Sequence, residues 1–185
     1  DPVRVAAALP AASPPLLDFR RGGFELAGTR PVLVRAFNVL RQYAEDEVAG
    51  AWDLVLASMA PGGLLVEGTC DEIGRLSTWV LVSSAGPVSL TLSMRLAGLD
   101  RPSTIAERLP KALIHRNVPG ERVHALLSAL DTCWATAAPH QAFGVRSRWL
   151  ETVRLLAARG WPVLGPPSRI RLGELTVPWA SVAPA

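Results

Sequence analysis

The segment at residues 67–75, EGTCDEIGR, carries the densest group of side chains that could take part in catalysis. It holds three carboxylates, Glu67, Asp71 and Glu72, with Cys70 between them. A carboxylate can remove a proton from an acceptor or bind a basic group of a substrate. A solvated loop whose acids pair with nearby arginines explains the same residues equally well. We predict Glu67, Asp71 and Glu72 as catalytic candidates and Cys70 as a substrate-binding candidate.

A second group of polar side chains lies in residues 110–124, PKALIHRNVPGERVH. His115 is the candidate for proton transfer, because imidazole titrates near neutral pH. Arg116 and Asn117 are the candidates for binding an anionic substrate. The alternative is a solvated turn between two helices. No metal site is predicted, because the three histidines and two cysteines have no ligand-like spacing.

The elements that must position these groups form a β-α-β pattern. Residues 31–36 read as a buried strand, 45–59 as an amphipathic helix, 61–63 as a Pro-Gly-Gly turn and 64–68 as a second buried strand. Strands joined in this way lie parallel, and parallel sheets bind ligands at the carboxyl ends of their strands. Those ends carry Arg35, Phe37 and Asn38 after the first strand, and the acidic segment after the second.

The remaining patterns are predicted from periodicity and from proline and glycine positions. Residues 77–84 and 88–96 predict a β-hairpin, and the strict alternation in its second strand predicts one solvent-exposed face. Helices are predicted over residues 1–9, 119–137 and 146–159, with another over 102–113 that Pro110 should break. Short strands are predicted over residues 16–19 and near 169–177.

The β-α-β segment resembles class I S-adenosylmethionine-dependent methyltransferases. Asn38-Val39-Leu40 matches the turn after the family's fourth strand, and Met59-Ala60-Pro61-Gly62-Gly63-Leu64-Leu65 matches the turn into its fifth strand. The resemblance covers residues 1–75, with 17–26 similar to the third strand. It implies an α/β fold: a mostly parallel, Rossmann-like sheet with an antiparallel hairpin and a helical C-terminal section. Residues 1–100 would form a partial core, and 101–185 would pack on the same domain.

The resemblance also implies transfer of a methyl group from S-adenosylmethionine to an acceptor of unknown size. By position, the acid that holds the ribose would fall at Asp1 or just before it. Phe24 and Glu25 would flank the adenine, and Arg35, Phe37 and Asn38 would line the inner side of the cofactor. The segment from Glu67 to Glu72 would face the acceptor. The family's glycine-rich loop is not in this sequence, and Gly23 stands where an acid usually meets the adenine. We therefore expect the groups for ribose and methionine to precede Asp1, and the chain to bind the cofactor weakly or not at all. A degenerate binding or assembly module is the alternative.

Composition narrows the function classes further. The apolar fraction is 49% and the net charge is +3, as in an ordered globular protein. Arginine supplies all but one of the 19 basic residues, so a nucleic-acid-associated protein is a further alternative that a clustered arginine face would support. No apolar run is long enough to span a bilayer, so no membrane partner is expected. We predict a cytoplasmic protein, and an exposed sheet edge that allows two copies to pair.

Overall fold

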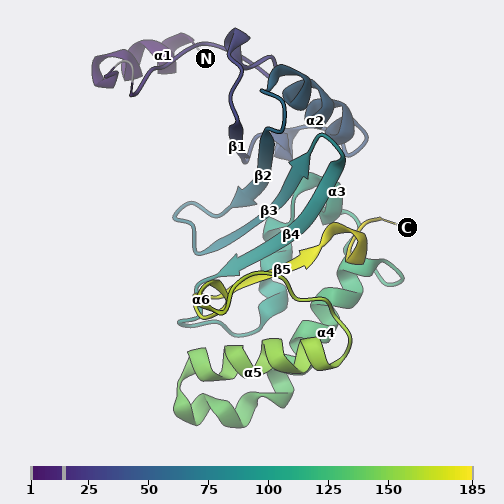
Figure 1. Ribbon diagram of the computed structural model, residues 1–185. Coiled ribbons are helices and arrows are strands. Elements are labelled where there is room, and N and C mark those ends of the chain that lie inside the picture. The colour runs from purple at the N-terminus through teal and green to yellow at the C-terminus, as the bar shows by residue number, and fades with distance from the viewer. Residues whose placement is uncertain (1, 14–15, 185) are drawn as a thin grey trace.

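The computed structural model describes residues 2–13 and 16–184, and its centre is one five-stranded sheet (Figure 1). The strands lie in chain order across the sheet, β1-β2-β3-β4-β5. Their bounds are β1 Leu33–Phe37, β2 Leu64–Cys70, β3 Leu76–Ser83, β4 Gly86–Met94 and β5 Glu174–Pro178. Only β1 and β2 are parallel, and the other three neighbouring pairs are antiparallel.

The predicted mostly parallel Rossmann-like sheet is therefore wrong: the protein has a mostly antiparallel sheet with C-terminal helices. A parallel connection needs a crossover of a dozen or more residues, whereas a tight turn joins antiparallel strands. The short turns after Cys70 and after Ser83 make β2-β3 and β3-β4 hairpins. Residues 17–26 also form no strand beyond a single bridge between Ser13 and Leu17.

The one parallel unit is the predicted β-α-β segment. Its crossover is α2, Glu47–Ser58, and β1 pairs with β2 in the register Leu33↔Leu64 to Phe37↔Gly68. One stripe of α2 is buried, as expected for an amphipathic helix packed on a sheet, and consists of Val48, Ala51, Trp52 and Val55. The predicted parallel pairing and the predicted amphipathic helix are confirmed.

The segment after β4 is mainly helical, as predicted. Its α-helices are α3 Lys111–Ile114, α4 Arg122–Thr136, α5 Val145–Ala158 and α6 Pro167–Ile170. Short 3-10 helices are η4 Pro102–Arg108, η5 Ala138–Phe143 and η6 Trp179–Ser181. Pro110 separates η4 from α3, which confirms the predicted break. Before the sheet lie α1 Pro2–Ala8, η1 Leu9–Ala11 and η2 Leu26–Gly28, and η3 Leu40–Gln42 follows β1.

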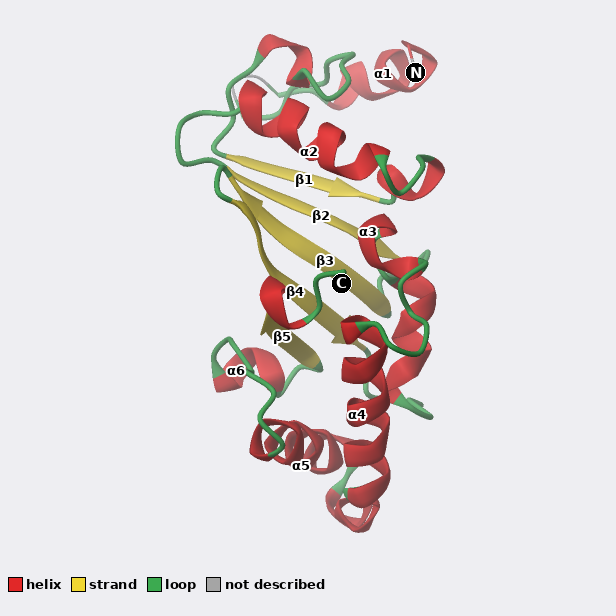
Figure 2. Cartoon of the chain, turned by 90° about the vertical axis from the view of Figure 1, so that its right-hand side faces the viewer, coloured by secondary structure: helices red, strands yellow, loops and turns green. Residues whose placement is uncertain are grey.

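The helices α3 and α4 cover one face of the sheet (Figure 2). The core between them and the sheet is apolar, and its fully buried members include Val80, Leu90, Leu92, Ile105, Leu113 and Leu126. The prediction that one face of β4 is exposed to solvent is wrong for the middle of the strand. Ser89 and Thr91 are only 7% and 4% exposed, because β4 lies between β3 and β5 and Thr91 hydrogen-bonds Thr176 on β5 at 2.9 Å. Over the described residues, no helix combines the length and the apolar character needed to cross a membrane.

Candidate functional site

The carboxyl ends of β1 and β2 are joined by Asn38. Its backbone N–H donates to the carbonyl of Gly68 at 2.8 Å, and its side-chain Oδ1 accepts from the backbone N–H of Cys70 at 3.0 Å. Its Nδ2 also lies 3.4 Å from the Cys70 Sγ. Asn38 has φ 59°, a left-handed conformation that asparagine tolerates better than most residues. We call Asn38, Cys70 and Asp71 the rim.

The edge of the sheet that carries the rim continues past β2 to β5. Cys70 on β2 pairs with Ser77 near the start of β3, and Leu76 pairs with Met94 at the end of β4. Ser93 in turn pairs with Glu174 at the start of β5. The ends of β2 and β4 therefore lie along one side of the molecule, beside α6, on the left in Figure 1. Side chains from segments far apart in the sequence meet at this edge.

Asp71 faces a hollow at this edge. The hollow has a volume of about 360 Å³ and is lined by Asp71, Arg75, Leu76, Arg95, Ala97, Gly98, Leu99, Asp100 and Thr104. The Asp71 Oδ1 accepts a hydrogen bond from the backbone N–H of Arg75 at 2.7 Å, which holds the carboxylate in place. Glu72 is exposed in the turn between β2 and β3. Asp71 is thus a carboxylate at the mouth of a cavity, whereas Glu72 faces solvent.

Glu67 lies inside the protein, on the face of β2 that the helices cover. It is 1% exposed and pairs in register with Ala36 on β1 and Val80 on β3. Neither carboxylate oxygen has a hydrogen-bond partner among the described residues. Burial raises the pKa of Glu67 from its ordinary 4.5 to about 7, because desolvation disfavours the charged form. The neighbouring Trp52 opposes this rise in pKa, although its indole N–H also lacks a well-formed hydrogen bond within the described chain.

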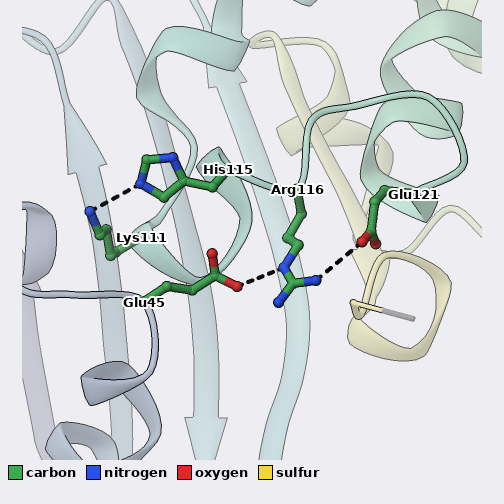
Figure 3. Close-up of polar contacts among 5 residues, drawn as sticks. All are labelled: Glu45, Lys111, His115, Arg116 and Glu121. Carbon is green, nitrogen blue, oxygen red and sulfur yellow. Dashed lines mark hydrogen bonds and ion pairs between the residues drawn. The ribbon is translucent and has the colours of Figure 1, made fainter.

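His115 lies next to Lys111, with 3.1 Å between Nε2 and Nζ (Figure 3). Both side chains line a small hollow of about 170 Å³ with Arg41, Leu109 and Ile114. Arg41 belongs to η3 and is three residues after the rim residue Asn38, and its Nη1 donates to the carbonyl of Glu107 at 3.2 Å. His115 is therefore near the end of β1, but no hydrogen bond in the described structure connects it to Asp71 or Glu72.

Arg116 and Asn117 have partners within the protein. Arg116 forms ion pairs with Glu45 at 2.6 Å and Glu121 at 3.3 Å, and these contacts raise the pKa of its guanidinium (Figure 3). The Asn117 Oδ1 lies 3.2 Å from the His124 Nδ1. Arg116 thus links the segment before α2 to the turn between α3 and α4, which leaves its charge already matched by carboxylates.

The residues assigned to the cofactor by resemblance are spread over several places. Phe24 packs against Tyr43 with 5.6 Å between ring centroids, and the Glu25 carboxylate accepts from the N–H of Gly23, which lowers the pKa of Glu25. Gly23 lines a hollow of about 470 Å³ formed within residues 18–31. Asp1 lies outside the described residues.

Arg35 and Phe37 lie together on the other face of the sheet from Glu67. The Arg35 guanidinium stacks 3.7 Å from the centre of the Phe37 ring. The ring centroids of Phe37 and Trp79 are 6.3 Å apart. Alternate residues of a strand point to opposite faces, so these two side chains point away from the face that carries Ala36 and Glu67. Of the predicted residues, the structure brings Asn38, Cys70 and Asp71 together at the strand ends and stacks Arg35 on Phe37 on one face of the sheet.

The sequence analysis missed a second hollow at the same edge. It has a volume of about 450 Å³ and is lined by Arg95, Leu96, Ala97, Gly144, Val145, Arg146, Arg171 and Leu172. Its three arginines come from the end of β4, the start of α5 and the segment after α6. No local motif connects them, and the only signal in the sequence was an arginine beside the boundary of each element.

No group of three histidine, cysteine or acidic side chains in the described ranges is arranged to hold a metal ion. Comparisons of the chain with protein-family models, with curated proteins and with solved structures found no match.

Proposed function

We propose that this chain takes part in the transfer of a methyl group from S-adenosylmethionine to an acceptor at the rim. The observation that carries the proposal is the parallel β1-α2-β2 unit with Asn38 connecting its two strand ends. This is the segment that resembles the methyltransferases, and antiparallel pairing of β1 with β2 would have excluded the resemblance. The proposal rests on these two parallel strands and draws no support from the rest of the sheet, which is antiparallel.

Methyl transfer depends mainly on holding the acceptor in line with the sulfonium and on removing a proton from the acceptor. Asp71 is the carboxylate that the geometry favours for the second task, because it lines a hollow and is oriented by the N–H of Arg75. Glu67 is buried in the core, so a proton could reach its carboxylate only after local opening of the sheet. We assign the role of base to Asp71.

A nuclear magnetic resonance titration of the ¹⁵N-labelled chain with S-adenosylmethionine tests the proposal, because it detects weak binding. We expect millimolar cofactor to shift the amide signals of Asn38, Cys70 and Asp71. Replacing Asn38 by Ala should reduce these shifts. Asn117→Ala is the matched control, because Asn117 bonds His124 away from the rim. If the amide signals of the rim residues do not shift at millimolar cofactor, the chain does not bind S-adenosylmethionine there.

A non-catalytic binding or assembly module is the second candidate. The absence of a glycine-rich loop from the sequence favours it, as does the neutralisation of Arg116 by Glu45 and Glu121. The two candidates differ in the effect of Asp71→Asn. This change should abolish transfer of a labelled methyl group if Asp71 is the base, and should leave binding by a non-catalytic module unchanged.

A further inference from the structure

We infer that the 450 Å³ hollow at the sheet edge binds a phosphate-bearing small molecule through Arg95, Arg146 and Arg171. We call these three residues the arginine trough. They come from three segments: Arg95 follows β4, Arg146 is in the first turn of α5, and Arg171 follows α6. The fold therefore brings three arginines to the lining of one cavity.

The charges of the trough are not matched by carboxylates. No ion pair joins Arg95, Arg146 or Arg171 to an acidic side chain in the part of the chain that the structure describes. Other arginines of the same protein do have such partners: Arg154 pairs with Glu151 at 2.6 Å, and Arg169 pairs with Glu174. Three like charges around one hollow repel one another, and a bound anion would relieve this repulsion.

The geometry of the side chains favours phosphate among anions. A guanidinium presents a planar set of N–H donors that matches two phosphate oxygens at once, and arginine is the common residue for such recognition. The hollow also includes Val145 and Arg146 at the N-terminus of α5, where the helix dipole adds to the positive potential. Its apolar walls, formed by Leu96, Val145 and Leu172, suit the organic part of a small ligand.

The trough adjoins the rim. The 450 Å³ hollow and the Asp71 hollow share Arg95 and Ala97 as lining residues. The Asp71 hollow holds two carboxylates, Asp71 and Asp100, beside its arginines, whereas no carboxylate of the described residues lines the trough, so a phosphate would favour the trough. A ligand anchored there would extend its uncharged part toward Asp71. Describing this ligand as the methyl acceptor rests on the proposed function, whereas phosphate binding itself does not.

Calorimetric titration of the full chain with inorganic pyrophosphate tests the site. We expect pyrophosphate to bind, and the variants R95Q, R146Q and R171Q to weaken binding at least tenfold each, because a charge-assisted hydrogen-bonding group is removed. R154Q is the matched control: it removes one positive charge from the same helix as R146Q, but outside the hollow, and should change the affinity less than twofold. Thermal unfolding of each variant should match the unmodified protein, because these side chains are exposed.

Two further titrations distinguish a small phosphate-bearing ligand from a nucleic acid. Adenosine 5′-monophosphate should bind more tightly than adenosine, which lacks the phosphate. A single-stranded 12-nucleotide DNA that binds far more tightly than pyrophosphate, with R154Q as damaging as R95Q, would overturn the small-molecule site in favour of a nucleic-acid surface. Absence of pyrophosphate binding would overturn it outright. If pyrophosphate binds but S-adenosylmethionine does not shift the rim amides, the trough stands and the proposed function fails.

Discussion

At the scale of single residues, the most unusual feature is the buried Glu67. Ionising a buried carboxyl group whose two oxygens have no hydrogen-bond partner costs free energy, and the raised pKa of Glu67 reflects this cost. The folded state holds the proton of Glu67 up to about pH 7, whereas the unfolded chain releases it near pH 4.5. Between these values the folded state binds more protons, so the contribution of Glu67 to the free energy of unfolding falls as pH rises.

We therefore predict that Glu67→Gln removes a pH dependence. From pH 5 to pH 8, the difference in unfolding free energy between the variant and the unmodified protein should move by about 2 to 3 kcal/mol in favour of the variant. Urea denaturation at both pH values measures this. Glu72→Gln, at an exposed position in the neighbouring turn, should show no such movement. Equal differences at pH 5 and pH 8 would mean that Glu67 is ionised normally in the folded protein.

Asn38 combines a left-handed backbone with side-chain hydrogen bonds, and two substitutions separate these contributions. Asn38→Gly loses the bonds to Cys70 but accepts φ 59° without strain, so it should lower the free energy of unfolding by about 1 kcal/mol. Asn38→Ala loses the bonds and strains the backbone, so its loss should be about 2 kcal/mol. Denaturation measures both losses, and hydrogen exchange of the Cys70 amide should accelerate in both variants. If Gly is as damaging as Ala, the backbone conformation contributes nothing.

At the scale of elements, the close approach of β2 and β3 depends on Gly68. A Cβ atom at Gly68 would overlap the backbone carbonyl of Thr78 and come within 2.7 Å of the Trp79 Cβ. Backbone cannot move aside as a flexible side chain can, so the hairpin tolerates only glycine there. The same residue accepts the hydrogen bond from Asn38, which connects the sheet spacing to the geometry of the rim.

The change Gly68→Ala should therefore lower the free energy of unfolding by about 3 kcal/mol, as in overpacked cores. Gly50 is the control, because it lies inside α2, is exposed, and has no heavy atom within 4 Å of an added Cβ. Gly50→Ala should raise the free energy of unfolding by about 1 kcal/mol through helix propensity. Chemical denaturation of both variants measures these changes in the free energy of unfolding. Similar small effects at the two sites would show that a Cβ atom at Gly68 does not clash with β3.

At the scale of the whole molecule, the C-terminal segment completes the sheet that the N-terminal segment begins. β5 pairs with β4, and Leu175 of β5 is 1% exposed in the same core as Val80 and Leu90. The chain should therefore unfold as one unit. At the opposite edge, Leu33 of β1 and the preceding Val32 are 59% and 71% exposed. Pairing of two copies through this edge stays a prediction for light scattering to test.

We predict that Leu175→Ala lowers the free energy of unfolding by about 2 to 5 kcal/mol, the usual effect of removing a large core side chain. The midpoints reported by helical circular dichroism and by tryptophan fluorescence should shift together, because one core connects sheet and helices. Leu172→Ala should have an effect of about 0.5 kcal/mol or less, because Leu172 is 61% exposed. Separate transitions for the two probes would show two independent folding units.

The elements with local signals could be predicted from the order of the residues alone. The apolar runs on either side of an amphipathic helix predicted β1, α2, β2 and their parallel pairing, and Pro110 predicted the break before α3. These predictions are correct because the spacing of apolar residues and the backbone geometry of proline act within a few residues. The sequence also identified Asn38 and Asp71 at the strand ends, since a parallel pair brings its carboxyl ends together.

The remaining features depend on contacts between segments that lie far apart in the chain. The order of the strands depends on pairings across the whole chain, such as β4 with β5, so resemblance over residues 1–75 led to a parallel sheet that did not form. The burial of Glu67 depends on the helices that cover its face of β2. The arginine trough depends on three element ends that meet in space although 76 positions of sequence, from Arg95 to Arg171, separate the outer two. Long-range packing sets these relationships, and no local pattern of residues encodes it.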